Sequence, residues 1–396
     1  MSLLVQKFGG TSVGTPERIQ AVADRIAAVR KQGHQLVIVV SAMGQSTDEL
    51  IELAHKVSSA PPLREMDMLL TVGERISMAL LSMALADRKI AAVSLTGSQS
   101  GIITDQSHRR ARIKKILGDR VRAALSDQKV VIVAGFQGVS EAKEITTLGR
   151  GGSDTTAVAM AATLGAERCE IFTDVDGVYS ADPRIVPEAK LWRRIPHDLM
   201  VELATRGAGV LHPRSVELAK QYGVALLVRN SLNENEGTEV VSTAGMEDFR
   251  VVGVTADTTK MLLSVELTRP TVLGSLWAKA AELHLGMVAP HFSDGKVRCF
   301  VDRETSGEWR KLLDKLTVDG FVTRYLLEPN LVPLSVVGDR FAQDGAALGQ
   351  VVDTLAAAEI LITMGTASAL AITVAVPEHR ANEGVRVLHE QLFRAK

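Results

Sequence analysis

The sequence contains few of the residues that build disulfide frameworks and metal centres. Among 396 residues there are only two cysteines, Cys169 and Cys299, and each lies inside an apolar stretch. Two thiols so far apart form neither a zinc motif nor a disulfide framework, which is typical of a reducing compartment. The nine histidines show no H-x-x-x-H or H-E-x-x-H spacing, so we expect no protein-bound metal.

Excess charge and long apolar runs are also lacking. The 45 Lys and Arg residues balance 46 Asp and Glu residues, and the net charge is −1. That balance argues against a role that depends on bulk attraction to nucleic acid or to a membrane surface. No apolar run approaches the roughly 20 residues needed to span a bilayer, and no basic segment precedes the first expected strand, Leu3–Phe8. We therefore expect a soluble, cytoplasmic protein without nucleic-acid or membrane partners.

Short apolar runs and amphipathic helices alternate through residues 1–240, and the length predicts two or three domains. The first helix is clearly marked, because Thr15 suits the N-cap, Pro16 suits the first turn and an apolar face follows. The alternation predicts an α/β domain with a mostly parallel sheet covered by helices on both faces. The expected strands are Leu3–Phe8, Leu36–Val40, Ile90–Leu95, Val130–Gly135, Glu170–Thr173 and Ala225–Arg229.

After Met246 the pattern changes to two smaller α+β modules, expected at residues 250–325 and 330–396. Each module has the β-α-β-β-α order of a small ligand-binding module. The elements of the first are Met261–Leu267, Thr271–Leu283, Val297–Val301 and a helix near Trp309–Leu316. Those of the second are Val332–Val337, Ala346–Ala358, Leu370–Val376 and Glu378–Leu392.

A glycine loop follows the first strand and precedes the first helix. Gly9 and Gly10 let backbone N–H groups approach phosphate oxygens, and Lys7 places a cation beside them. The alternative is a tight turn with a solvated lysine. The loop is not the G-x-x-x-x-G-K-[ST] motif, which excludes the P-loop class for this segment.

A second glycine cluster, Thr146–Asp154, opens another expected helix, Thr155–Leu164. Arg150 suits bidentate hydrogen bonding to a carboxylate, and Ser153 at the start of a helix suits the binding of an anion. Asp154 has two interpretations, which are compatible: a helix N-cap, or a carboxylate that orients a cation such as Lys7.

Three further segments carry candidate site residues. Thr173–Arg184 contains Asp-x-Asp-Gly but has Ile185 where a calcium loop needs Glu, so a nucleotide's ribose and base fit it better. Ser41 ends the second strand, with Thr47 shortly after. Glu74 lies in an apolar helix, where a functional carboxylate competes with a solvated ion pair to Arg75 or Arg64.

Together these stretches resemble the aspartate kinases of the amino acid kinase superfamily. The matching segments follow the family's order and cover the first 230 residues. They are KFGGTS at Lys7–Ser12, VSAMG at Val40–Gly44 with Thr47, GERIS at Gly73–Ser77, TGSQSG at Thr96–Gly101, VAGFQG at Val133–Gly138, TTLGRGGSDTTA at Thr146–Ala157 and TDVDGVYSADPR at Thr173–Arg184. Uridylate, acetylglutamate and glutamate kinases share the lysine and the glycine loops, whereas GERIS and TTLGRGGSD favour aspartate.

The resemblance implies the amino acid kinase fold, ATP with Mg²⁺, and L-aspartate as acceptor. Lys7 and Asp154 would be catalytic. The nucleotide would contact Lys7, Phe8, Gly9, Gly10, Ser41, Ser153, Thr173, Asp174, Tyr179, Asp182 and Arg184. Aspartate would be held by Thr47, Glu74, Arg150, Gly151, Gly152 and Ser153, with Glu74 reading its amino group.

The chain also departs from the family pattern. Gly209 stands where the family usually has a lysine that contacts ATP, and Arg206 or Arg184 could substitute for it. The C-terminal part resembles paired ACT modules, through which we expect a homo-oligomer to form. In those modules the groups that bind amino-acid effectors are replaced at three places, Thr268–Thr271, Pro290-His291 and Asp344-Gly345. We therefore expect weak or absent inhibition by lysine or threonine.

Three functions follow from these observations. The first is an active aspartate kinase, which makes 4-phospho-L-aspartate at the entry to lysine, threonine and methionine synthesis. The second is a kinase of the same superfamily that phosphorylates another carboxylate. The third, motivated by Gly209, is a catalytically weak regulatory subunit with ACT modules.

Overall fold

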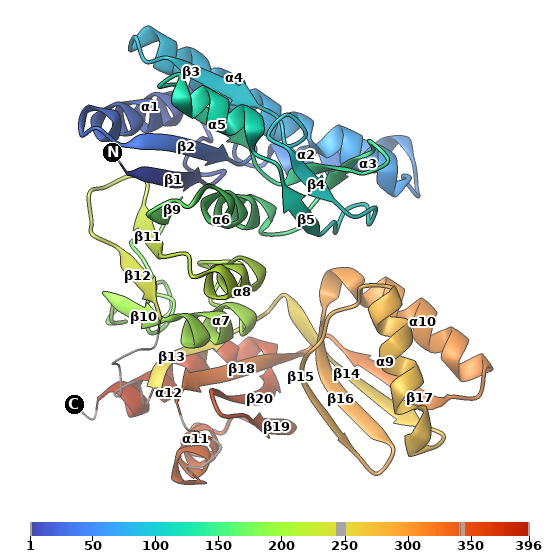
Figure 1. The fold of residues 1–396 in the computed structure, drawn as a ribbon. Coiled ribbons are helices and arrows are strands. Elements are labelled where there is room, and N and C mark those ends of the chain that lie inside the picture. The colour runs from blue at the N-terminus through green and yellow to red at the C-terminus, as the bar shows by residue number, and fades with distance from the viewer. Residues whose placement is uncertain (1, 243–250, 340, 342–344, 395–396) are drawn as a thin grey trace. The chain divides into compact units, whose positions relative to one another are not determined.

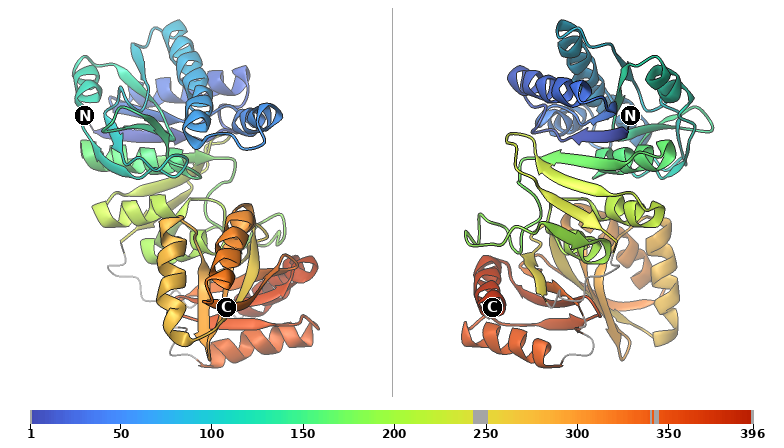
Figure 2. Two further views of the ribbon diagram at one scale, coloured as in Figure 1. Left: turned by 90° about the vertical axis from the view of Figure 1, so that its right-hand side faces the viewer. Right: turned by 60° about the vertical axis from the view of Figure 1, so that its left-hand side comes forward.

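The computed structural model describes residues 2–242, 251–339, 341 and 345–394. The chain forms two compact units. Unit 1 comprises Met1–Val178, Leu191–Met200 and Val210–Ala244, and unit 2 comprises Tyr179–Lys190, Val201–Gly209 and Gly245–Lys396. Figures 1 and 2 show the elements of both units.

Unit 1 is built on an eight-stranded sheet with the order β10-β12-β11-β9-β1-β2-β6-β3. All neighbouring strands are parallel except β11 and β12, so the predicted α/β fold class is confirmed. The strands are β1 (Leu3–Phe8), β2 (Gln35–Val40), β3 (Ala92–Leu95), β6 (Val130–Ala134), β9 (Arg168–Thr173), β10 (Arg194–Pro196), β11 (Leu226–Asn230) and β12 (Thr238–Val241).

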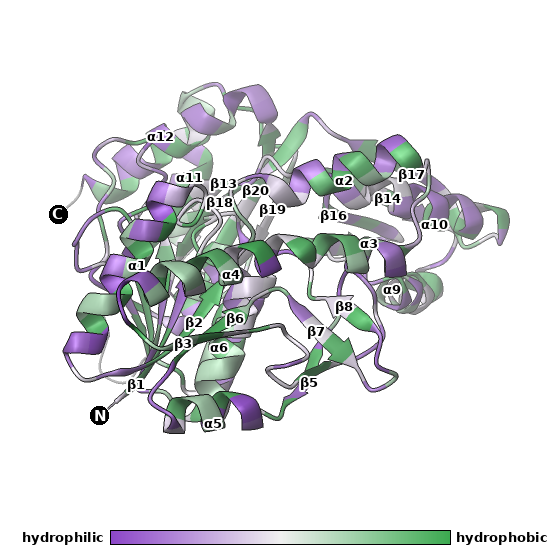
Figure 3. Cartoon of the chain, turned by 90° about the horizontal axis from the view of Figure 1, so that it is seen from above, coloured by the Kyte–Doolittle hydropathy of each residue, from purple (hydrophilic) through white to green (hydrophobic). Residues whose placement is uncertain are grey.

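The central strands are apolar on both faces because helices cover both. Leu36, Ile38 and Val40 of β2 join one core cluster, while Val37 and Val39 between them are also fully buried. Successive side chains of a strand point to opposite faces, so only a sheet covered twice buries all five. In Figure 3 the green colour of β2 and β6 marks their hydrophobic residues.

The helices that cover the sheet are amphipathic or wholly buried. α4 contacts α1 and strands β2, β3 and β6, and α6 contacts β1, β2 and β9. The helices of this part of the chain are α1 (Pro16–Lys31), α2 (Ser46–Val57), α3 (Leu63–Leu70), α4 (Val72–Asp87), α5 (Asp119–Ser126), α6 (Gly152–Leu164), α7 (His197–Thr205) and α8 (Pro213–Tyr222).

The starts of α1 and α6 differ in how well they match the predicted positions. The Thr15 hydroxyl accepts from the N–H of Arg18 at 3.3 Å, and Pro16 begins α1, as predicted. The expected start of α6 at Thr155 is wrong, because the helix begins at Gly152 after Gly151, which has a positive φ of 64°. Asp154 is therefore not the N-cap but lies in the first turn of α6.

A small sheet in unit 1 was not predicted. It has the order β5-β4-β7-β8. Its strands have only three or four residues, and β5 has no buried residue, so they lack a recognisable apolar pattern. They are β4 (Ile102–Thr104), β5 (Ile113–Ile116), β7 (Gln137–Ser140) and β8 (Ile145–Thr147).

Unit 2 contains two four-stranded sheets, one formed by a module inserted within the other. The inserted module has the strand order β15-β16-β14-β17, and the C-terminal module β13-β18-β20-β19. The inserted module consists of β14 (Lys260–Leu267), α9 (Leu273–Glu282), β15 (Val288–Ser293), β16 (Lys296–Asp302), α10 (Ser306–Val318) and β17 (Val322–Glu328). The C-terminal module consists of β13 (Val251–Ala256), β18 (Leu331–Gly338), α11 (Gly345–Ala357), β19 (Met364–Ala367), β20 (Ala371–Pro377) and α12 (Ala381–Phe393).

The pairing of β13 corrects the predicted module boundary. Residues 251–256 were assigned to the first module, yet β13 pairs antiparallel with β18 of the C-terminal module. The two sheets of unit 2 share a small apolar cluster, formed by Leu262, Phe300, Met364 and Ala375. Asp344, one of the expected effector-site substitutions, lies outside the described residues.

The expectation that no run is long enough to span a membrane is wrong by length and composition. The stretch Leu63–Asp87, which comprises α3 and α4, passes that test with a mean hydropathy of 1.5. Half of its most apolar window is buried inside the protein, and α4 packs on three strands. These contacts are those of a core helix.

Candidate active site

The carboxyl ends of four parallel strands meet at one edge of the main sheet of unit 1. Backbone hydrogen bonds join them: the N–H of Gly9 donates to Phe172 at 3.2 Å, Ser41 to Phe8 at 3.1 Å, and Gly135 to Val40 at 3.0 Å. Ligands of open parallel sheets gather at this edge. The structure therefore brings three of the predicted loops together.

Gly10 is required by the closeness of two of these loops. A Cβ at Gly10 would lie 2.9 Å from the carbonyl oxygen of Ala42. The Gly10 carbonyl in turn accepts from the N–H of Gly44 at 3.1 Å. Any larger residue would push the loop after β1 away from the loop after β2.

Lys7 is held by a carboxylate from the helix on the same face of the sheet. Its Nζ lies 2.6 Å from Oδ1 of Asp154, and both side chains are 12% exposed. Lys7 and Phe8 are consecutive in β1 and therefore point to opposite faces of the sheet. The ring of Phe8 is completely buried and stacked on the ring of Phe172, with centroids 4.7 Å apart. The Lys7 ammonium is thus not the solvated lysine of the alternative interpretation, while Phe8 can meet a ligand only through its backbone.

Glu74 is a buried carboxylate with spare hydrogen-bonding capacity. Only 3% of it is exposed, and Oε1 accepts from the N–H of Ala42 at 3.2 Å. Oε2 has no hydrogen-bond partner among the described residues. Burial raises the pKa of Glu74 to about 7. The solvated ion pair is excluded because Glu74 is buried, and Arg64 bonds to Glu65 and Glu144 on the surface.

The remaining predicted acceptor residues lie on the loops and helix starts of unit 1. Ser153 is buried in the first turn of α6, and Arg150 is exposed in the loop between β8 and α6. Thr47 and Ser41 are partly buried, with Thr47 in the first turn of α2. A helix start lined by serine and glycine can bind an anion through backbone N–H groups.

The Thr173–Arg184 segment is divided between the two units. In unit 1 the Thr173 hydroxyl donates to Asp174 at 3.1 Å, and Asp174 is exposed. Asp176 accepts hydrogen bonds from three amides, those of Asn230, Asn233 and Asn235, which hold its pKa below the ordinary value. Asp176 therefore stabilises the loop.

Unit 2 holds the other nucleotide candidates. Asp182 accepts from the guanidinium of Arg184 at 2.7 Å, which lowers the pKa of Asp182, and Tyr179 is partly buried. Gly209 has a φ of 68°, a conformation that costs a lysine roughly 1 kcal/mol or more. Arg206, a candidate substitute for the missing lysine, bonds to Glu202 at 3.0 Å.

Comparison with known proteins identifies the family of this chain. The model of the amino acid kinase family matches residues 2–230, which are more than half of the chain. The chain belongs to the amino acid kinase family. Within it, the chain is 43% identical to the aspartokinase of Geobacillus stearothermophilus over 98% of this chain and 97% of that one. It is 42% identical to aspartokinase 2 of Bacillus subtilis, over 100% and 99% of the two chains.

Solved structures of the family share the fold. The crystal structure of aspartate kinase from Synechocystis is 39% identical, with a TM-score of 0.57 over 100% of this chain and 70% of that one. That of E. coli aspartokinase III in complex with aspartate and ADP has a TM-score of 0.86 at 24% identity, over 99% and 100%. The C-terminal sheets agree with the predicted ACT modules.

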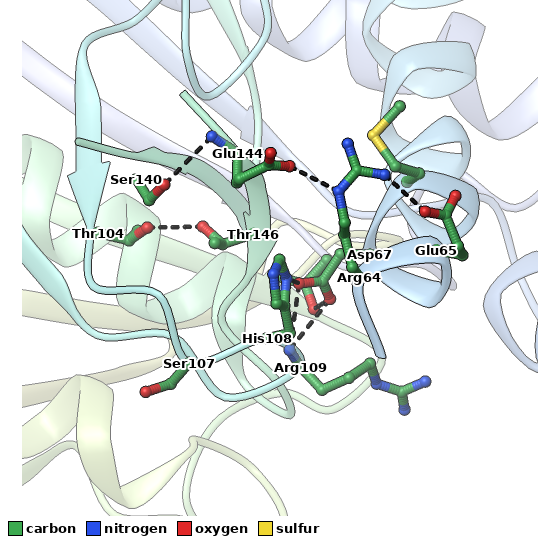
Figure 4. Close-up of polar contacts among 12 residues, drawn as sticks. Arg64, Glu65, Asp67, Thr104, Ser107, His108, Arg109, Ser140, Glu144 and Thr146 are labelled. Carbon is green, nitrogen blue, oxygen red and sulfur yellow. Dashed lines mark hydrogen bonds and ion pairs between the residues drawn. The ribbon is translucent and has the colours of Figure 1, made fainter. Parts of the chain in front are cut away.

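Asp67 on α3 is a buried acidic residue that was not predicted from the sequence. It is completely buried, bonds to His108 and Arg109, and lies beside the exposed Arg64–Glu144 pair (Figure 4). The signal that could have revealed it is an aspartate among methionines and leucines in Met66–Leu70, since charged residues are seldom fully buried without partners.

Proposed function

We propose that this protein transfers the γ-phosphoryl group of ATP to the side-chain carboxylate of L-aspartate. The observation that carries the proposal is Glu74, a buried carboxylate with one oxygen left without a partner among the described residues. A buried acceptor of this kind suits an ammonium group. Family membership supplies the reaction class, and Glu74 the preference for an amino acid.

Acceptor binding uses charges at both ends of the amino acid. The ammonium of aspartate pairs with Glu74, and the guanidinium of Arg150 grips a carboxylate, with Thr47 and the Gly151–Ser153 helix start completing the site. Glu74 bonds to Ala42 in the loop after β2, and a Cβ at Gly135, just after β6, would meet Ser153 at 2.8 Å. These contacts at the carboxyl ends of two strands support the assignment.

Nucleotide binding uses Lys7 and the Gly9–Gly10 loop for the phosphates, with Ser41 and Ser153 nearby in the fold. Thr173, Asp174, Tyr179, Asp182 and Arg184 are assigned to the nucleoside end. No group of three His, Cys, Asp or Glu side chains among residues 2–242, 251–339, 341 and 345–394 could hold a metal ion. Mg²⁺ commonly binds through substrate phosphates, so it would come with ATP and neutralise the charge of the phosphates.

The reaction needs no general base, because the acceptor carboxylate is already ionised at pH 7. A carboxylate oxygen of aspartate forms a bond to the γ-phosphorus as the bond to the bridging oxygen breaks, and ADP leaves with that electron pair. The obstacle is the approach of two anions. Lys7, oriented by Asp154, and the N–H groups at the start of α6 offset the repulsion and stabilise the transferring oxygens.

The test is ADP release with a panel of acceptors, including aspartate, glutamate and N-acetylglutamate. We expect aspartate to have the highest kcat/KM, and preference for another acid would contradict the proposal. A single-turnover measurement with saturating aspartate separates an active kinase from a weak regulatory subunit. A slow chemical step in the wild-type protein would favour the latter.

We also assign the protein to the cytoplasm and infer a homo-oligomer that forms through the ACT-like modules of unit 2. The inferred oligomer is supported by the edge strand β15, whose residues His291, Phe292 and Ser293 are exposed. An edge strand offers unpaired backbone groups to a second chain.

A further inference from the structure

Asp67 is a completely buried acidic residue on α3, and the proposed reaction assigns no role to it. A buried carboxylate persists only if donors satisfy both of its oxygens. Oδ2 lies 2.6 Å from Nδ1 of His108, and Oδ1 accepts from the Thr147 hydroxyl at 2.6 Å. The N–H of Arg109 lies 3.1 Å from Oδ1 and 3.3 Å from Oδ2. Asp67 thus fixes three donors from two segments that are distant in sequence. Figure 4 shows the contacts of His108 and Arg109 with Asp67.

One of these segments, residues 105–112, backs the loop that carries Arg150. A Cβ at Gly149, which has a φ of 77°, would meet the carbonyl oxygen of Arg109 at 2.8 Å. The N–H of Ala111 donates to the carbonyl of Thr147 at 2.9 Å. The residues before and beside Arg150 are therefore packed directly on this segment.

The backing segment is itself held in a costly conformation. Arg109 has a φ of 69°, a left-handed conformation that costs a residue other than glycine or asparagine on the order of 1 kcal/mol or more. It persists only where its surroundings fix it. The bonds from His108 and Arg109 to Asp67 supply that fixation from one side. On the other side the guanidinium of Arg214 donates to the carbonyls of Ala111 and Leu148, both at 3.1 Å.

Asp67 is also connected to the helix that carries Glu74. The N–H of Thr71, the residue between α3 and α4, donates to the Asp67 carbonyl at 3.2 Å. The Thr71 carbonyl accepts from the side chain of Gln137 on β7 at 3.1 Å. Hence α3, the start of α4 and the small sheet are bonded to one another around Asp67.

We propose that Asp67 is a positioning residue that fixes the Arg150 loop relative to the Glu74 helix, and so sets the spacing of the two charges that hold the acceptor. This inference rests on the proposed roles of Arg150 and Glu74. Donors on rigid elements cost less to order when the acceptor binds. Asp67 acts through Thr147 and the 105–112 segment.

The test removes the hydroxyl donor of Thr147 while keeping the shape of the side chain. Thr147→Val removes the hydroxyl, whereas Thr147→Ser keeps it. We expect Thr147→Val to raise KM for aspartate about tenfold and KM for ATP less than about twofold, with Thr147→Ser close to wild type. Glu65→Gln is the control. Glu65 is exposed and lies on α3, the helix that carries Asp67, so this substitution should change neither Michaelis constant. Asp67→Asn should act in the same direction as Thr147→Val.

A readout independent of activity separates this inference from the proposed function. Hydrogen–deuterium exchange of residues 105–112 and 147–151 should be faster in Thr147→Val than in wild type or Thr147→Ser. Unchanged exchange, or equal increases in both Michaelis constants, would overturn the positioning role. If the wild-type protein phosphorylated another acceptor, the proposed function would be wrong, and KM for that acceptor would replace KM for aspartate in the same comparison.

Discussion

The ammonium of Lys7, at the end of the first strand, lies 2.6 Å from a carboxylate oxygen of Asp154 in the first turn of α6. A lysine that reaches phosphates must be held in one direction despite its four-carbon side chain, and a nearby carboxylate does this. The pair also keeps two nearly buried charges balanced before any ligand binds.

Lys7→Ala should lower kcat by about 10²–10³-fold, because a preorganised cation acts mainly on charge that develops in the transition state. KM for ATP should rise less than kcat falls. Circular dichroism should show an unchanged fold. Lys31→Ala, at an exposed position in the last turn of α1, should behave as wild type. A Lys7→Ala enzyme that turned over near the wild-type rate would remove Lys7 from the phosphate site.

The pKa of Glu74 predicts how acceptor binding depends on pH. Burial raises that pKa to about 7, so the fraction ionised increases from about a tenth at pH 6 to about nine tenths at pH 8. Only the ionised form attracts an ammonium, so KM for aspartate should fall about tenfold over this interval. Glu74→Gln should raise KM for aspartate and abolish the dependence. A KM that is flat with pH in the wild type would contradict the role of Glu74.

Arg150→Ala should raise KM for aspartate roughly 10–100-fold, since a charge-assisted hydrogen bond contributes about 1.5–3 kcal/mol. KM for ATP should stay within about twofold of wild type. Arg120→Ala, in the first turn of α5 and exposed, is a matched control. Equal increases in both constants would point to a structural role for Arg150.

Asp174 and Asp176 are two residues apart, yet we predict separate effects. Asp176→Ala removes the acceptor of three amide hydrogen bonds and should cost about 1–3 kcal/mol of unfolding free energy. Asp174→Ala should leave the Tm unchanged and raise KM for ATP. The lowered pKa of Asp176 means that its stabilisation is present above the unfolded-state value and is lost as the pH falls through the folded-state value. Denaturant titrations at pH 7 and pH 3 check this sign.

Inhibition by lysine or threonine, alone or together, should be weak. The Thr268 N–H donates to the Phe321 carbonyl and its hydroxyl to the Gly320 carbonyl at 2.9 Å, so this turn is occupied within its own module. Pro290 offers no backbone donor. Titration of activity with both amino acids up to millimolar concentrations decides the question. Strong concerted inhibition would show that an effector site exists despite these substitutions.

Elements that form through local interactions can be predicted from the amino-acid sequence. A few consecutive residues reveal the continuous apolar runs of β2 and β6, because burial on both faces of the sheet requires an apolar side chain at every position. They also reveal the capped start of α1, because the first N–H groups of a helix need an acceptor close by in the sequence. The glycines that mark the loops after β1 and β8 are visible for the same reason.

Contacts between segments that are distant in sequence become visible only in the folded chain. The pairing of β13 with β18 across the inserted module, the burial of Glu74 and the three donors around Asp67 depend on contacts between residues far apart in sequence. A carboxylate in an apolar helix has the same local pattern whether it faces water or a backbone N–H. Its pKa, and with it the chemistry of the site, is set by neighbours that only the folded chain supplies.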